Sequence, residues 1–171
     1  MPYLNLNGRL LDLGRPTVMG IINLTPDSFY AASRYSDIAS VLSQIEEMLT
    51  EGAGIIDIGA VSTRPHSNQV SVDTELERLM PVVESVLKNF PEIVLSIDSF
   101  QAKVVKEVAE ITSFIVNDIS GFGMDSDILD VVALYKLPYI LMHIKGSPQT
   151  MTDNTQYKDL IFDMLQYFGK K

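Results

Sequence analysis

Polar side chains follow each of five short apolar runs in the sequence, at the point where each run ends. They are Asn23, Thr25, Asp27 and Ser28 after the first run, Ser62, Thr63 and Arg64 after the second, Asp98 after the third, Asn117 and Asp118 after the fourth, and His143 and Lys145 after the fifth. The carboxyl ends of parallel strands share one edge, where active sites are built. One aspartate at a strand end is usually a turn residue, but five polar ends together predict a shared site.

The residue types in this set favour particular chemistry. Asn23, with Thr25 and Asp27, would help to hold Mg²⁺, which prefers a few protein oxygens plus substrate phosphate. The planar guanidinium of Arg64 suits phosphate or carboxylate. Asp98 and Asn117 would pair with a heterocycle that has donors and acceptors on its edge, because a carboxylate only accepts whereas an amide does both.

Three other residues have weaker claims to a role. Asp57 lies inside the apolar run "IIDIG", where a buried carboxylate must be paired, so we expect a supporting role. His143 is either a histidine at the edge of the core or a ligand contact, and Lys145 is a loop lysine or a phosphate neighbour. The sequence has no phosphate-binding P-loop, nucleophile elbow or His-Glu-x-x-His motif.

Alternating strands and helices are needed to place these side chains. The apolar runs are Val18–Ile22, Gly54–Ile58, Ile93–Ile97, Phe114–Val116 and Pro138–Met142. Their near-continuous apolar character predicts parallel strands buried on both faces. Five stripes of apolar residues at helical spacing, the last over Leu160–Phe168, predict helices packed in the core. The pattern predicts an α/β fold, either a doubly wound sheet or part of a (β/α)₈ barrel.

No linker divides the chain, so we expect one domain over residues 1–171, with an N-terminal hairpin in residues 1–16. The hairpin signal is Asn7-Gly8, flanked by alternating apolar and polar residues. The net charge of −9 argues against a general nucleic-acid binder. The lack of cysteine excludes disulfides and thiolate metal sites. No signal peptide or membrane span is evident, and we expect a cytoplasmic protein.

Five segments in order resemble the successive motifs of the dihydropteroate synthase family. They are "NLTPDSF", "IIDIGAVSTRP", "SIDSF", "IVNDISG" and "LMHIKGSPQTM". The resemblance implies a TIM barrel, truncated here to about the first five β-α units. It also implies a Mg²⁺-assisted transferase, the target of sulfonamides, that joins 6-hydroxymethyl-7,8-dihydropterin pyrophosphate to p-aminobenzoate and releases pyrophosphate.

The resemblance also implies roles for single residues. Asn23 would bind Mg²⁺ and pyrophosphate, and Thr63 and Arg64 would lie near the p-aminobenzoate and pyrophosphate sites. Asp98 and Asn117 would hold the pterin. Arg64 and Asp98 are the expected catalytic residues.

Met142 would line the pterin pocket. Two positions depart from the family pattern, because Val61 stands where glutamate is frequent and Ala31 where aspartate is frequent.

The chain is shorter than the roughly 250 residues of a TIM barrel. We therefore expect an N-terminal portion that lacks later motifs, is incomplete for full activity and forms a homodimer or another self-associated state. Two alternatives stay open: a pterin- or folate-binding methyltransferase of the related barrel type, and a non-catalytic binding fragment.

Overall fold

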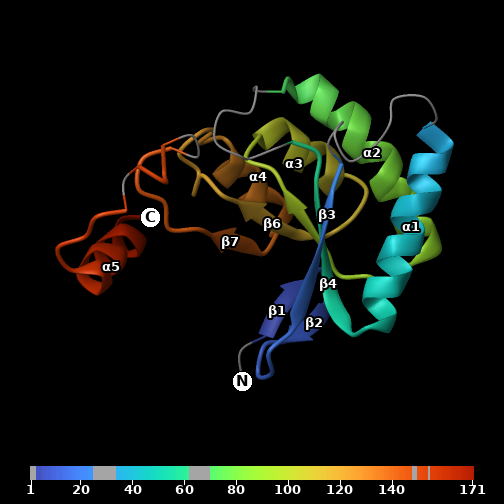
Figure 1. Cartoon of the computed structure of the whole chain (residues 1–171), viewed down its shortest axis with the longest axis horizontal. Helices are drawn as coiled ribbons and strands as arrows, with labels where there is room; N and C mark the ends of the chain where they lie inside the picture. The colour runs from blue at the N-terminus through green and yellow to red at the C-terminus, as the bar shows by residue number, and fades with distance from the viewer. Residues whose placement is uncertain (1–2, 25–33, 62–69, 148–149, 154) are drawn as a thin grey trace.

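The computed structural model describes residues 3–24, 34–61, 70–147, 150–153 and 155–171. The strands are β1 (Tyr3–Leu6), β2 (Arg9–Asp12), β3 (Val18–Asn23), β4 (Ala53–Gly59), β5 (Leu95–Asp98), β6 (Ile115–Asp118) and β7 (Tyr139–Leu141). The helices are α1 (Arg34–Thr50), α2 (Val72–Asn89), α3 (Ala102–Ala109), α4 (Ile128–Tyr135) and α5 (Leu160–Lys170). Figure 1 shows their arrangement. Among the described helices, none is long and apolar enough to cross a membrane.

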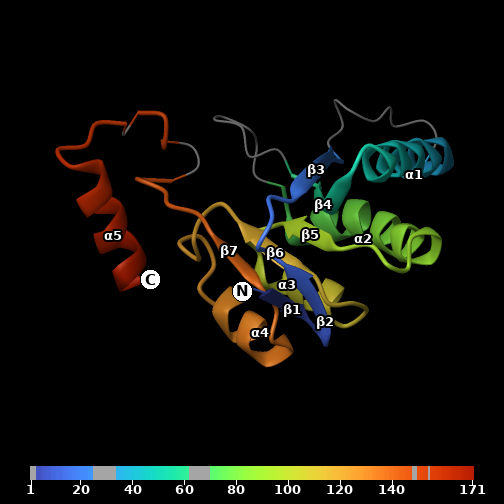
Figure 2. The same ribbon diagram turned by 90° about the horizontal axis from the view of Figure 1, so that it is seen from below.

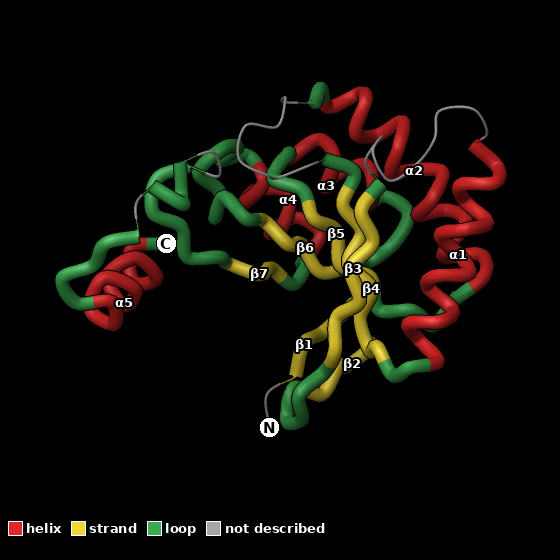
Figure 3. Tube along the Cα trace, in the orientation of Figure 1, coloured by secondary structure: helices red, strands yellow, loops and turns green. Residues whose placement is uncertain are grey.

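Strands β3 to β7 form one parallel sheet in which each strand pairs with the next along the chain. This order has no reversal, whereas a doubly wound sheet reverses at a switch point. The sequential order is that of a barrel wall, so the barrel alternative is confirmed over the doubly wound one. These five strands form an open sheet with β3 and β7 at its edges (Figure 3).

The main core lies between one face of this sheet and the helices. It includes Ile22, Ile58, Ile97 and Val116 from alternate strand positions, which pack with buried helix residues such as Leu79. Alternate residues of a strand point to opposite faces, so the remaining positions face the other side. The expectation of strands buried on both faces is wrong for β3, where Ile21 is 59% exposed, because the helices cover only one face.

The N-terminal hairpin covers the start of the strands on the face opposite the helices. β1 and β2 pair antiparallel, and Asn7 and Gly8 both have positive φ, as the Asn-Gly signal predicts. Leu6 of the hairpin forms a second apolar cluster with Ile55, Val94 and Ile115. Figure 2 shows the hairpin beside the strands. The amino ends of the strands are therefore closed by apolar side chains, and their carboxyl ends are left for polar ones.

Helix α5 lies apart from the other helices in both views (Figures 1 and 2). Its apolar stripe was expected in the core, and that expectation is wrong, because none of its described side chains is buried. Ile161 and Leu165 are both about two-thirds exposed. Tyr167 and Phe168 of α5, and Lys171 just after the helix, contact the rest of the described chain, whereas Ile161 and Leu165 stay exposed. Self-association of the chain stays a prediction.

We expect the core to be much more sensitive to truncation than the exposed helix surfaces. Replacing Leu79, which is 1% exposed, by alanine should lower the free energy of unfolding by about 2–5 kcal/mol, because a cavity is left. The same change at Leu134, which is 72% exposed, should cost at most about 0.5 kcal/mol. Urea denaturation measures both, and equal losses would contradict the placement of the core.

Candidate active site

The register of the sheet brings the predicted polar residues into one row at the carboxyl ends of the strands. Asn23 pairs with Gly59, Gly59 with Asp98, and Asp98 with Asn117. Because paired residues of adjacent strands point to the same face, these positions all lie on the face that the helices leave uncovered. The structure therefore brings together three of the predicted site residues, from β3, β5 and β6.

Asp57 on β4 lies two residues before Gly59 of this row and forms hydrogen bonds with Asn117 on β6, across the intervening strand β5. The Asn117 side-chain nitrogen donates to both carboxylate oxygens of Asp57, at 3.3 and 3.2 Å. Burial raises the pKa of Asp57, and the hydrogen bond from Asn117 acts in the opposite direction. The contact with Asp57 fixes the orientation of the Asn117 amide group, whose oxygen has no role in this hydrogen bond.

Asp98 occupies the centre of the row in a crowded, negative environment. Burial raises its pKa to about 7, and the charges of Asp57, Glu75 and Asp118 add to the shift. A Cβ atom at position 59 would meet Cβ and Oδ2 of Asp98 at 3.3 Å, so Gly59 leaves room for this side chain. A ligand that offers N–H donors or positive charge would favour the ionised carboxylate and so bind strongly here.

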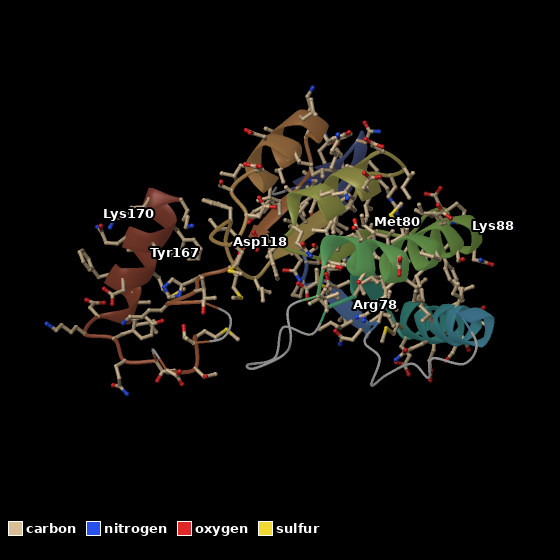
Figure 4. The ribbon with its side chains drawn as sticks, turned by 90° about the horizontal axis from the view of Figure 1, so that it is seen from above. Arg78, Met80, Lys88, Asp118, Tyr167 and Lys170 are labelled. Atoms are coloured by element: carbon tan, nitrogen blue, oxygen red, sulfur yellow. The ribbon has the colours of Figure 1, made fainter. Side chains whose placement is uncertain are left out.

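Asp118, the next residue after Asn117, faces the helices and is fully buried. Its carboxylate accepts hydrogen bonds from the backbone N–H groups of Ser120 (2.7 Å) and Phe122 (2.8 Å) and from the Tyr139 hydroxyl (2.5 Å). Figure 4 shows Asp118 between α5, which carries Tyr167 and Lys170, and the end of the molecule that carries Arg78. Its oxygens are satisfied within the protein, so Asp118 shapes the loop after β6.

The segment after Asp98 is fixed by side chains from other parts of the chain. Ser99 Oγ accepts a hydrogen bond from the backbone N–H of Gln101 at 3.2 Å. Helix α3 has no cap from its own N-cap residue, and Asp125 accepts from the Ala102 N–H instead, at 2.8 Å. Asp125 belongs to the loop after β6, so the ends of β5 and β6 are tied together behind the polar row.

The remaining predicted residues fall in different places. Thr63 and Arg64 lie outside the described residues, as do Thr25, Asp27 and Ser28. Asn23 is exposed at the end of β3. Met142 follows β7, is half-buried, and its carbonyl oxygen accepts from the Tyr167 hydroxyl at 3.1 Å.

The contacts of His143 and Lys145 lie away from the polar row, with α5 and with the segment before it. The His143 ring meets the Tyr167 ring edge-to-face, with centroids 4.8 Å apart. Lys145 Nζ donates to the Gln156 carbonyl at 2.6 Å and lies 4.5 Å from the centre of the Tyr157 ring. These contacts favour the structural reading of His143 and a loop-fixing role for Lys145.

Sequence reasoning missed several polar residues that support the row: Glu75, Gln101, Asp125 and Tyr139. A signal for Glu75 was present, because it lies one turn before Leu79, on the buried stripe of α2. A carboxylate at such a position needs a partner from another element. The other three have no comparable signal, since their partners come from distant parts of the chain.

The sequence model of the family described as "Pterin binding enzyme" matches residues 19–171. The dihydropteroate synthase of Synechocystis sp. is 43% identical over 169 residues, which are 98% of this chain and 58% of the relative. The dihydropteroate synthase of Haemophilus influenzae is 40% identical over 165 residues, or 96% of this chain and 59% of the relative.

Solved structures give the same picture. The Yersinia pestis dihydropteroate synthase with a sulfonamide drug complex superposes with a TM-score of 0.87 at 38% identity, over 99% of this chain and 61% of that one. The Xanthomonas albilineans dihydropteroate synthase with 4-aminobenzoic acid gives 0.84 at 32% identity, over 99% and 59%. The chain thus spans about three-fifths of the length of these relatives, and both the resemblance and the barrel-type fold are confirmed.

The raised pKa of Asp98 predicts a pH-dependent effect of replacing it. Between about pH 4 and pH 7 the unfolded chain loses this proton while the folded protein keeps it, so the wild type loses stability as the pH rises. Below about pH 4 both states hold the proton and the difference disappears. The side chain of the Asp98→Asn variant cannot ionise. The free energy of unfolding of the variant should therefore rise relative to that of the wild type by on the order of 2–4 kcal/mol as the pH increases through this range.

The measurement is urea denaturation of wild type and variant near pH 4 and near pH 8. The matched control is Asp153→Asn, because Asp153 is exposed and lies away from the polar row. A stability difference for Asp98→Asn that does not change with pH would contradict the assignment.

Proposed function

Because the chain belongs to the pterin-binding enzyme family, we propose that it serves the dihydropteroate synthase reaction. In that reaction 6-hydroxymethyl-7,8-dihydropterin pyrophosphate and p-aminobenzoate give 7,8-dihydropteroate and pyrophosphate. The observation that carries the proposal is the row of Asp98 and Asn117 on the uncovered face of the sheet. The names of the relatives supply the reaction.

The chemistry of the row fits the edge of a pterin. A pterin carries an exocyclic amino group and a ring N–H side by side, both of which are donors. The carboxylate of Asp98 would accept from this donor pair, and the amide oxygen of Asn117 would accept from a further N–H of the reduced ring. Met142 would add an apolar contact to the ring.

The proposed reaction is a substitution at the methylene carbon of the pterin. The bond from this carbon to the pyrophosphate oxygen breaks with its electron pair, and the aryl amine nitrogen then forms a new bond to the carbon and loses a proton. The negative charge of Asp98 would stabilise positive charge on the pterin as pyrophosphate departs. Thr63 and Arg64 would hold p-aminobenzoate and pyrophosphate near the same carbon.

Mg²⁺ is the expected metal, and the donor chemistry of the site fits it in a limited way. Within the described residues, no group of three or more His, Cys, Asp or Glu side chains is placed to hold a metal ion. Mg²⁺ commonly uses only one or two protein oxygens together with substrate phosphates and water, and the exposed amide of Asn23 offers one such oxygen. The bound ion would offset negative charge on the pyrophosphate.

Formation of the two products tests the proposed function. The chain is mixed with the pterin pyrophosphate and p-aminobenzoate, the released pyrophosphate is measured, and 7,8-dihydropteroate is identified by mass spectrometry. Calorimetry with the pterin pyrophosphate alone should show that Asp98→Asn weakens binding by about 10- to 100-fold, because a charged acceptor is lost. Asp153→Asn is the control.

Three outcomes decide between the readings. Formation of dihydropteroate supports the transferase, and binding without turnover supports a binding fragment. Methyl transfer from methyltetrahydrofolate would replace the proposal by the methyltransferase alternative.

The metal assignment has its own test. Mg²⁺ with pyrophosphate should raise the melting temperature of the wild-type chain by a few degrees, because ligands that bind only the folded state stabilise it. Asn23→Ala should lose most of this shift, whereas Asn5→Ala in the hairpin should keep it. Equal shifts in the wild type and Asn23→Ala would remove Asn23 from the metal site.

A further inference from the structure

Two charged residues near the start of α2 lie behind the polar row and have no part in the proposed ligand contacts. Glu75 is 1% exposed, and Arg78 is partly buried one turn further along the helix. A carboxylate that is almost fully buried costs free energy unless it interacts with specific partners. The positions of those partners show what this pair of residues does.

Glu75 contacts the segment that follows β5. Its Oε2 atom accepts a hydrogen bond from the side chain of Gln101, while Oε1 has no hydrogen-bond partner within the described part of the chain. Gln101 is joined in turn to Ser99 through its backbone N–H. A chain of contacts therefore runs from α2 through Gln101 to Ser99, the residue next to Asp98.

Arg78 contacts the end of β4. Its Nη1 atom donates to the backbone carbonyl of Ala60 at 3.1 Å, and Ala60 directly follows Gly59 of the polar row. The positive charge of Arg78 also favours the ionised form of Glu75, against the effect of burial, which raises the Glu75 pKa. One turn of α2 thus holds the ends of two neighbouring strands.

We propose that Glu75 and Arg78 are positioning residues: together they fix the ends of β4 and β5 relative to each other and so set the place of Asp98 in the site. The proposal rests on the proposed function only for what Asp98 binds. The contacts themselves are independent of any ligand. Neither residue touches the uncovered face of the row, so both act through Ala60 and Gln101.

Glu75 also affects Asp98 through its charge. The negative groups that raise the Asp98 pKa come from three elements: Asp57 on β4, Glu75 on α2 and Asp118 on β6. Replacing Glu75 by glutamine removes one of these charges but keeps an acceptor for Gln101. Replacing it by leucine removes both, so the two variants separate the hydrogen bond from the charge.

The experiment combines affinity with two measurements that need no ligand. Glu75→Leu should weaken binding of the pterin pyrophosphate about tenfold or more and speed amide hydrogen exchange at Gln101 by a similar factor. Glu75→Gln should recover most of the affinity, and carboxyl-carbon NMR should show that Asp98 titrates at lower pH than in wild type. Arg78→Lys should weaken binding without the shift in Asp98 titration.

Two controls separate positioning from general stability. Glu77→Leu and Glu77→Gln alter an exposed glutamate on the same helix and should match the wild type. Leu79→Ala destabilises α2 but should leave the Asp98 titration unchanged. The proposal is overturned if the Glu75 variants keep wild-type exchange at Gln101 and wild-type Asp98 titration, or if Leu79→Ala reproduces their effects.

The two proposals fail in different ways. A wild-type chain that does not bind the pterin pyrophosphate contradicts the proposed function. The exchange at Gln101 and the Asp98 titration still decide whether Glu75 positions this segment.

Discussion

The register of the parallel sheet determines what this protein presents at its candidate site. One row crosses four strands, because each of its residues pairs with the next: Asn23, Gly59, Asp98 and Asn117. Three of these residues have side-chain oxygen atoms, and Gly59 has no side chain. A shift of one residue in any pairing would turn a side chain of the row toward the helices. The apolar contacts of Ile58, Ile97 and Val116 with the helices oppose such a shift, so the core and the site are fixed by the same alternation.

Above the apolar cluster that the hairpin closes, the strands carry several carboxylates close together. Like charges in a half-buried place repel, and the three carboxylates differ in how this repulsion is offset. Asp118 is surrounded by donors, Asp57 is paired with an amide, and Asp98 is left with its proton held up to neutral pH. Only the last arrangement keeps a carboxylate ready for a new partner. The difference between the acids that are already paired and the one proposed to bind a ligand therefore follows from their hydrogen bonds rather than from their position at strand ends.

Much of this organisation can be predicted from the sequence. The Asn7-Gly8 turn, the order of strands and helices, and the polar strand ends all follow from local patterns. The Asp57–Asn117 bond does not, because it crosses an intervening strand and depends on register. The role of Glu75 is likewise visible only when α2 is seen against β5. The apolar stripe of α5 predicts a helix correctly but not its burial, since periodicity shows which residues share a face and not what covers that face. The ligand roles of Asn23, Thr63, Arg64, Asp98, Asn117 and Met142 stay predictions.

Gly59 makes two distant positions of the chain interdependent. The space that its missing side chain leaves is occupied by Asp98, on the neighbouring strand. A larger residue at position 59 requires the side chain at position 98 to shift. Among homologous barrels the two positions should therefore vary together, and a substitution at one would open an evolutionary route to change at the other. The shape of the row at Asp98 is in this sense a property of a pair of residues and not of a single acid.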